Sequence, residues 1–229
     1  MKSKVKGKDK GVSEVVGYIL TFSIVIVAVT LIYTSGMPMV EQTSETAVLQ
    51  NMKTSFISLR SNVKKVALDQ SPVRTVKFNL IKGSIGANKS AGSITVNVSG
   101  TLYNQSFGNI EYTIGSKKVI YENGAVIEST TGGNIIISDP PIYFTNYTGN
   151  KNVFISVINV SGDFSAGGGI AEMHLRHDNT NVSIYKDKDV TINIASSYQD
   201  AWDRYLNETF GSFPITSCNL TLVTHNVSI

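Results

Sequence analysis

A run of 26 residues without a charged side chain, from Val15 to Val40, limits what this chain can fold into more than any other feature. The part from Val15 to Tyr33 is almost entirely apolar, and as a helix rising about 1.5 Å per residue it matches the roughly 30 Å hydrocarbon core of a bilayer. An ordinary secretory signal has an apolar core of only about 7–15 residues. We therefore expect a membrane-spanning helix; the alternative is a secretory signal cut near Thr34–Gly36, which would release a product beginning at Met37.

The basic excess of the chain lies before this run. The net charge is +3, but the first eleven residues, with five lysines and Asp9, carry +4, so the rest of the chain carries −1. Binding to a nucleic-acid backbone depends on clustered cationic side chains, so we expect no nucleic acid among the partners. The lysines before the run, with Glu41 and Glu45 after it, predict that the N-terminus is cytoplasmic and that everything beyond Val40 is outside.

The start of the run has a distinctive order: a basic stretch, a small residue, then a carboxylate at the head of an apolar helix. The residues are Lys10-Gly11-Val12-Ser13-Glu14-Val15-Val16-Gly17-Tyr18-Ile19-Leu20. Over about its first forty residues the chain resembles archaeal type IV pilins and related pilin-like surface proteins, whose short class III leader is cut before the hydrophobic segment. The resemblance implies cleavage by a prepilin peptidase between Gly11 and Val12 and an assembly role for Glu14, a position where many archaeal pilins have proline.

The same resemblance implies a function and a set of partners. The mature chain would be a structural subunit, and not an enzyme, of a surface filament that serves adhesion, attachment or motility. Its partners would be other pilin subunits, the prepilin peptidase, a membrane assembly platform with its ATPase, and the bilayer before assembly. A permanently anchored, single-span protein whose extracellular domain binds a ligand without polymerising is the alternative, and an exported enzyme is a third.

Physical chemistry supports a carboxylate at the position of Glu14. A negative charge in the first turn of a helix is stabilised by roughly 0.3–1 kcal/mol, and its cost in a membrane falls toward the interface. If the chain is cut after Gly11, Glu14 would lie near a free α-ammonium of its own or a neighbouring chain, and this pair would set the stagger between subunits. The simpler alternative is that Glu14 sits among the lipid head groups.

Beyond the apolar run the pattern predicts an amphipathic helix. Ser35–Pro38 should interrupt or bend the first helix, because glycine and proline both disfavour it. Apolar residues then recur at steps of three or four up to a stop at Asp69–Pro72: Val48, Met52, Phe56, Leu59, Val63 and Val66. We expect a leader over residues 1–11, a hydrophobic and then amphipathic stem over 12–68, and an extracellular head over 69–229.

From Val73 onward the chain changes to short runs rich in β-branched and aromatic residues. Asn123-Gly124 carries a hairpin signal, and a short capped helix is expected near residues 197–207. The fold class predicted is α+β, with a β-rich, antiparallel, sandwich-like head. Strands are expected over Thr75–Ile81, Ser93–Tyr103, Asn109–Ile114, Lys118–Tyr121, Ala125–Glu128, Asn134–Ser138, Ile142–Phe144, Val153–Val160, Gly169–Arg176, Val182–Tyr185, Val190–Ile194, Thr216–Thr224 and Val227–Ile229.

Sequons for N-glycosylation are unusually frequent in this chain. Nine are present, whereas the numbers of Asn, Ser and Thr predict about four by chance. The excess suits a glycosylated outer surface, and it also suits an exterior protein whose polar residues happen to be Asn, Ser and Thr. Strand alternation predicts that Asn97 and Asn219 face solvent. The candidate sites are Asn88, Asn97, Asn104, Asn146, Asn159, Asn181, Asn207, Asn219 and Asn226.

Other clusters offer little chemistry, and we expect no cofactor, no metal site and no active site. His174 and His177 with Asp178 form the one ligand-like group, but a spacing of three points side chains to opposite faces of a strand. The single cysteine, Cys218, is predicted to be a small core residue. Ser165–Gly169 is predicted to be a flexible connection between strands, and calcium bound near Asp187 and Asp189 stays an open alternative.

Overall fold

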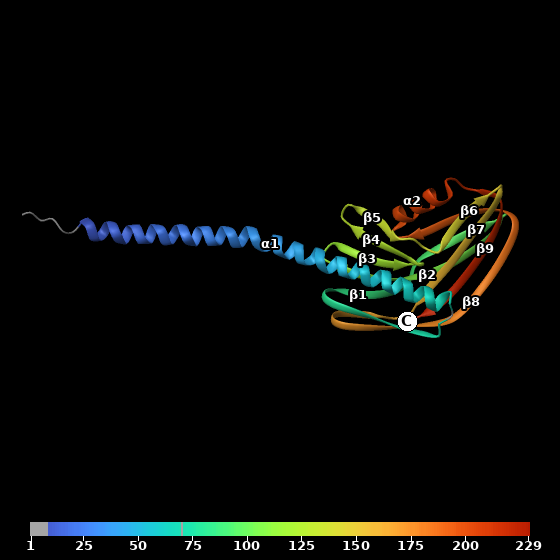
Figure 1. Ribbon diagram of the computed structural model, residues 1–229, viewed down its shortest axis with the longest axis horizontal. Coiled ribbons are helices and arrows are strands. Elements are labelled where there is room, and N and C mark those ends of the chain that lie inside the picture. The colour runs from blue at the N-terminus through green and yellow to red at the C-terminus, as the bar shows by residue number, and fades with distance from the viewer. Residues whose placement is uncertain (1–8, 70) are drawn as a thin grey trace, which may run out of the picture. The chain divides into compact units, whose positions relative to one another are not determined.

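The computed structural model describes residues 9–69 and 71–229, with side chains from residue 14 onward. Two helices and nine strands are found in this described part (Figure 1). They are α1 (Asp9–Ala67), β1 (Val73–Val98), β2 (Thr101–Ile114), β3 (Lys117–Glu122), β4 (Ala125–Thr130), β5 (Gly133–Ser138), β6 (Ile142–Tyr147), β7 (Asn150–Ser161), β8 (Ser165–Ser196), α2 (Gln199–Phe210) and β9 (Ile215–Ser228). The predicted α+β class, with a long N-terminal hydrophobic helix and a β-rich domain, is confirmed.

The N-terminal helix is continuous, contrary to one prediction. Helix α1 contains Pro38 in its interior and ends at Ala67, so of the two outcomes expected at Ser35–Pro38, an interruption or a bend, the interruption is wrong. Proline removes a single backbone donor, and a helix can continue beyond that loss. The chain divides into two compact units after Ala47, so the second part of α1, from Val48, belongs to the same unit as the strands.

The amphipathic stripe of α1 forms one of the two hydrophobic cores of this unit, which we call the α1 core. All six residues predicted for the stripe are buried there, and Phe56, Leu59, Val63 and Val66 are fully buried. Phe56 packs on Phe78 of β1 with ring centroids 5.8 Å apart. The stripe is therefore confirmed, and it lies against the sheet.

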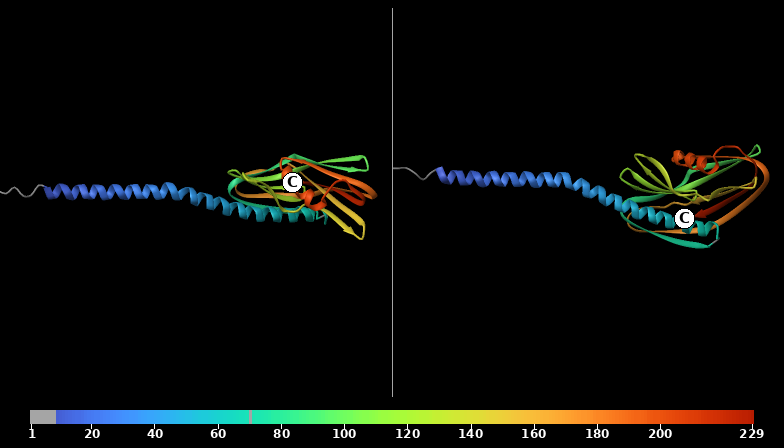
Figure 2. Two further views of the ribbon diagram at one scale, coloured as in Figure 1. Left: turned by 90° about the horizontal axis from the view of Figure 1, so that it is seen from above. Right: turned by 45° about the horizontal axis from the view of Figure 1, so that its top comes forward.

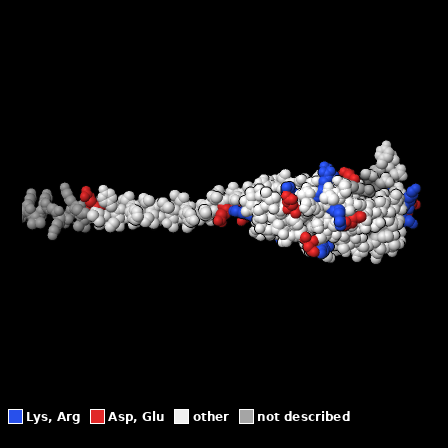
Figure 3. Space-filling view, turned by 90° about the horizontal axis from the view of Figure 1, so that it is seen from below, with Lys and Arg blue, Asp and Glu red and all other residues white. Residues whose placement is uncertain are grey.

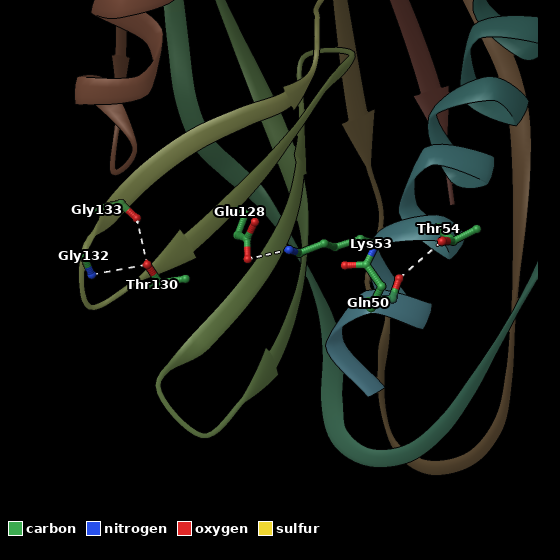
Figure 4. Close-up of polar contacts among 7 residues, drawn as sticks. All are labelled: Gln50, Lys53, Thr54, Glu128, Thr130, Gly132 and Gly133. Atoms are coloured by element: carbon green, nitrogen blue, oxygen red, sulfur yellow. Dashed lines mark hydrogen bonds and ion pairs between the residues drawn. The ribbon is translucent and has the colours of Figure 1, made fainter. Parts of the chain in front are cut away.

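Two side chains of α1, Lys53 and Arg60, make polar contacts with the sheet and its loops at the margin of the α1 core. The Lys53 ammonium lies 2.6 Å from Glu128 Oε1 on β4 (Figure 4). Arg60 Nε donates to the Gly124 carbonyl at 2.8 Å, and the same guanidinium donates to the Asp139 carbonyl. One arginine thus joins the helix to two separate loops of the sheet.

The strands form one sheet of order β5-β4-β3-β2-β1-β8-β9-β7-β6. Neighbours β7 and β9 are parallel, with Val153 facing Leu220, so the sheet is mixed and the wholly antiparallel prediction is wrong. The reason is that β8 and α2 come between these strands in the chain and return it to the same end, as a parallel pair requires. Strand β8 curves strongly along its length (Figure 2), and it pairs with β1 in two separate stretches.

The sheet is covered by a helix on each face over β3 and β4. Successive residues of β3 alternate: Val119 and Tyr121 belong to the α1 core, and Ile120 belongs to a second core around α2. This α2 core is centred on the fully buried Trp202. Helix α2 contacts β5, β6 and β8, so it touches both strands that end the sheet order.

The Asn-Gly signal located its turn correctly, whereas the expected strand Ser93–Tyr103 is wrong, because a turn at Ser99 and Gly100 divides it between β1 and β2. Asn123 and Gly124 both have positive φ, of 45° and 80°, and connect β3 to β4 as the hairpin signal predicts. The three strands expected between Gly169 and Ile194 are instead parts of the single strand β8, whose Asp187 has a φ of 52°. Ser165–Gly169 also lies in β8, so it is no flexible connection.

Candidate functional site

The first part of α1 presents an uninterrupted apolar surface. In the described residues, one helix is long and apolar enough to cross a membrane, and none of its most apolar window is buried. Leu20, Phe22 and Ile32 are 60–73% exposed, and a long section of this helix carries neither blue nor red atoms on the face drawn in Figure 3. Such a surface is stable only when lipid or another protein covers it.

The polar side chains in this segment are satisfied inside the helix. Thr21 Oγ1 donates to the Gly17 carbonyl at 2.9 Å, Ser23 Oγ donates to Ile19 at 2.8 Å, and Thr30 Oγ1 donates to Ile26 at 2.8 Å. Each hydroxyl thus uses a carbonyl four residues earlier and needs no water. The hydroxyls do not prevent the segment from entering an apolar environment.

Small residues leave room on one side of the segment. A Cβ placed on Gly17 would have no heavy atom within 4 Å. Further along, Ser23 and Ala28 lie in a shallow apolar groove of about 410 Å³ between Leu20 and Leu31. Small residues let another helix approach closely, so this surface suits helix packing as well as lipid.

The predicted leader lies largely outside the described residues. Gly11 and Val12 belong to helix α1, but the structure describes side chains only from Glu14 onward. Glu14 is exposed and lies within α1. A cut after Gly11 would place it in the first turn of the shortened helix.

Of the nine sequon asparagines, six are exposed and three are partly buried. Asn219 is exposed, as predicted, whereas Asn97 is only partly exposed and accepts a hydrogen bond from the Gly100 N–H at 2.9 Å. Asn159 and Asn226 are also partly buried, and Asn159 Nδ2 donates to Asn226 Oδ1 at 3.0 Å. The exposed acceptors are Asn88, Asn104, Asn146, Asn181, Asn207 and Asn219.

The histidines expected to be ligand-like are separated. His174 Nδ1 lies 3.1 Å from Thr75 Oγ1, whereas His177 Nε2 lies 2.9 Å from Thr180 Oγ1. Thr180 Oγ1 also lies 2.8 Å from Nδ1 of the buried His225, and burial lowers the pKa of His225 to about 4. Within the described residues, no group of three or more His, Cys, Asp or Glu side chains could hold a metal ion.

A buried acidic cluster between β2, β3 and α2 has no counterpart in the sequence predictions. Trp202 Nε1 donates to Oε1 of the fully buried Glu122 at 2.7 Å, and the Tyr198 hydroxyl donates to Glu111 Oε2. Burial raises the pKa of Glu122, while Lys118, 2.7 Å from Glu111, helps to lower the pKa of Glu111 against the effect of its partial burial. Glu122 and Trp202 are 80 residues apart, so no local pattern could pair them. The cluster holds α2 on the sheet.

Cys218 lies where the sequence predicts. It is buried in the α2 core, and burial raises the pKa of its thiol. A buried thiol of raised pKa is a poor nucleophile, so its role here is packing.

Comparison with known proteins places the chain in a family. A family of unknown function, DUF7289, matches residues 10–219. An uncharacterized protein of Archaeoglobus fulgidus is 24% identical over an alignment that covers 90% of this chain and 84% of the relative. No solved structure matches. Because the family match takes in both the apolar helix and nearly all of the β domain, the chain belongs to the DUF7289 family.

Proposed function

We propose that this protein is a structural subunit of an archaeal type IV pilus-like surface filament. The observation that carries the proposal is a basic segment ending in Gly11, followed three residues later by Glu14 and then by a long apolar helix whose most apolar window is not buried. A leader peptidase would cut between Gly11 and Val12, and the retained helix would hold the subunit in the bilayer until assembly. The archaeal source of the relative is compatible with this proposal.

Helix packing is the mechanism that we propose for assembly. Moving from lipid to neighbouring helices brings little hydrophobic gain, because lipid tails are as apolar as the side chains. Close packing at small residues such as Gly17 and Ala28, and pairing of Glu14 with a free α-ammonium, would therefore supply the specificity. The β domain would lie outside the filament core.

The N-terminus of the protein recovered from its native cell surface is the first test. We expect sequencing and intact mass to give a chain that begins at Val12. A chain that begins at Met1 would overturn the proposal in favour of a permanent signal anchor. A chain that begins at Met37 would also overturn it, because a secreted domain would then lack the apolar helix.

Filament formation is the second test. We expect Glu14→Ala to abolish or sharply reduce filaments seen by electron microscopy, because the ionic pair that sets the stagger is lost. Glu41→Ala, which removes an exposed carboxylate beyond the apolar run, is the matched control and should assemble normally. Processed protein that stays monomeric in the membrane, with normal surface display, would favour the alternative of a single-span binding protein.

A further inference from the structure

The β domain contains a cleft between two pairs of strands that lie far apart in the sequence. The cleft has a volume of about 330 Å³, within the range of small-molecule sites. One wall comes from β1 and β2, where Val96 faces Tyr103 and Ile94 faces Gln105. The other wall comes from β8 and β9, where Asn181 faces Thr224 and Ser183 faces Leu222.

The base of this cleft is apolar and has an aromatic side. Ile94, Val96 and Val157 are at most 1% exposed and line the cleft together with Leu222. The Tyr103 ring also lines it and is fixed by Tyr185, whose ring centroid lies 5.6 Å away at an interplanar angle of 51°. A ligand here would meet a rigid aromatic surface above buried aliphatic side chains.

The rim carries neutral polar groups that are free to bind a ligand. Within the described chain, the side chains of Asn181, Ser183 and Thr224 make no hydrogen bond, and Gln105 makes only a long one, of 3.4 Å, to the Ser106 carbonyl. No Asp, Glu, Lys, Arg or His is among the described residues that line the cleft. An ionic ligand would therefore lose its hydration without gaining an opposite charge.

We propose that this cleft binds a neutral saccharide. A sugar ring has an apolar face that stacks on an aromatic ring, and hydroxyls that exchange hydrogen bonds with amide and hydroxyl side chains. The cleft offers both kinds of contact on opposite walls, Tyr103 on one and Asn181 with Ser183 on the other. The inference concerns the β domain alone and holds whether or not the protein forms filaments.

The saccharide has two conceivable sources, because the cleft itself contains a sequon. Asn181 and Ser183 are the first and third residues of Asn181-Val182-Ser183. A glycan attached to Asn181 would begin at the mouth of the cleft and fill it from the same chain. A saccharide from another molecule would enter an unmodified cleft.

Saturation-transfer NMR on the full chain tests the site. The chain is produced in a host that adds no N-glycans and is kept in a detergent without a sugar head group. The probes are D-glucose, D-galactose, D-mannose and N-acetyl-D-glucosamine. We expect at least one probe to bind, and Tyr103→Ala to weaken that binding about tenfold by removing the ring contact. Tyr143→Ala is the control: Tyr143 is exposed and, like Tyr103, paired with another ring, that of Phe154, but it lies outside the cleft, so binding should persist.

The outcomes separate the proposal from its alternatives. The proposal would be overturned if none of the four probes bound. It would also be overturned if Tyr103→Ala and Tyr143→Ala weakened sugar binding equally. In protein from native cells, a glycan on Asn181 that blocks free sugar, while the protein from the host without N-glycans still binds it, assigns the cleft to the chain's own glycan. Binding of free sugar by the native protein assigns the cleft to a saccharide from another molecule.

Discussion

At the scale of single residues, two buried titratable groups give the protein opposite responses to pH. Glu122 is fully buried and its pKa is raised by burial, whereas the pKa of His225 is lowered to about 4. Both groups favour the neutral form in the folded state. Each therefore costs stability in the pH range where the unfolded chain carries the charge and the folded chain does not.

For Glu122, stability should fall as pH rises. The unfolded carboxyl loses its proton near its usual pKa of 4.5, while the folded carboxyl keeps it to higher pH, so the folded state binds more protons in between. We expect Glu122→Gln, which can still accept the Trp202 hydrogen bond, to remove this part of the pH dependence. The melting temperature of the full chain in detergent, measured from pH 4.5 to 8, checks it. If melting temperature changed with pH in the same way in the unmodified protein and in Glu122→Gln, the pH dependence would not come from Glu122.

For His225, stability should fall as pH drops. In the unfolded chain the imidazole gains a proton below about pH 6.5, whereas in the folded protein it stays neutral down to about pH 4. Between these pH values the unfolded state therefore binds more protons. We expect a loss of about 1–3 kcal/mol across the window. His225→Asn should flatten the slope, whereas His174→Asn, at an exposed histidine, should leave it unchanged. Denaturant unfolding of the unmodified protein and of the two variants at pH 7 and pH 5 measures these changes in stability.

At the scale of elements, the second part of α1 is a core helix with one buried face. We expect Phe56→Ala to lower the free energy of unfolding by about 3–5 kcal/mol, because it opens a cavity in a fully buried site. Ile57→Ala, one position further and 45% exposed, should change it by about 0.5 kcal/mol or less. Similar losses at both positions would show that this face of α1 is not the one that packs on the sheet.

Arg60 is expected to fix α1 to two loops at once. Arg60→Ala leaves the Gly124 and Asp139 carbonyls without their donor, and we expect a loss of about 1.5–3 kcal/mol in unfolding free energy. Arg60→Lys should recover little, since a single ammonium does not reproduce the planar fork of the guanidinium. Lys65→Ala, at an exposed cation on the same helix, is the control and should be close to neutral. Thermal melts of the three variants compare them.

Elements with a strong local signal were predictable, and those defined by distant partners were not. The spacing of Phe56 and Leu59 fixes a helical face, and Asn123-Gly124 fits only a turn with positive φ. Strand β8 was divided wrongly because polar residues separate its apolar stretches, although one strand with register shifts accommodates them. The cleft proposed to bind a saccharide is lined by residues near 100 in β1 and β2 and by residues near 180 and 222 in β8 and β9, and no local pattern brings these together.

At the scale of the whole molecule, the two units should be separable at a point inside α1. A fragment that begins at Glu45 keeps the apolar stripe with the sheet, and we expect it to be folded and soluble without detergent. A fragment that begins at Pro72 lacks that stripe, leaves Phe78 and its neighbours in the α1 core uncovered, and should aggregate or unfold. Circular dichroism and gel filtration distinguish the two. Insolubility of the longer fragment would mean that the β domain needs the apolar segment.

The position of α2 has a consequence for β domains at high local concentration. An open sheet ends in two strands with unused backbone groups, which invite strands of other molecules to add and so to aggregate. Here Asp200 accepts the Asn134 N–H of β5, at 3.4 Å, and the Tyr205 hydroxyl donates to the Ile142 carbonyl of β6, at 2.8 Å. One short helix thus occupies a backbone group at each border of the sheet, which should hinder the addition of strands from neighbouring β domains there.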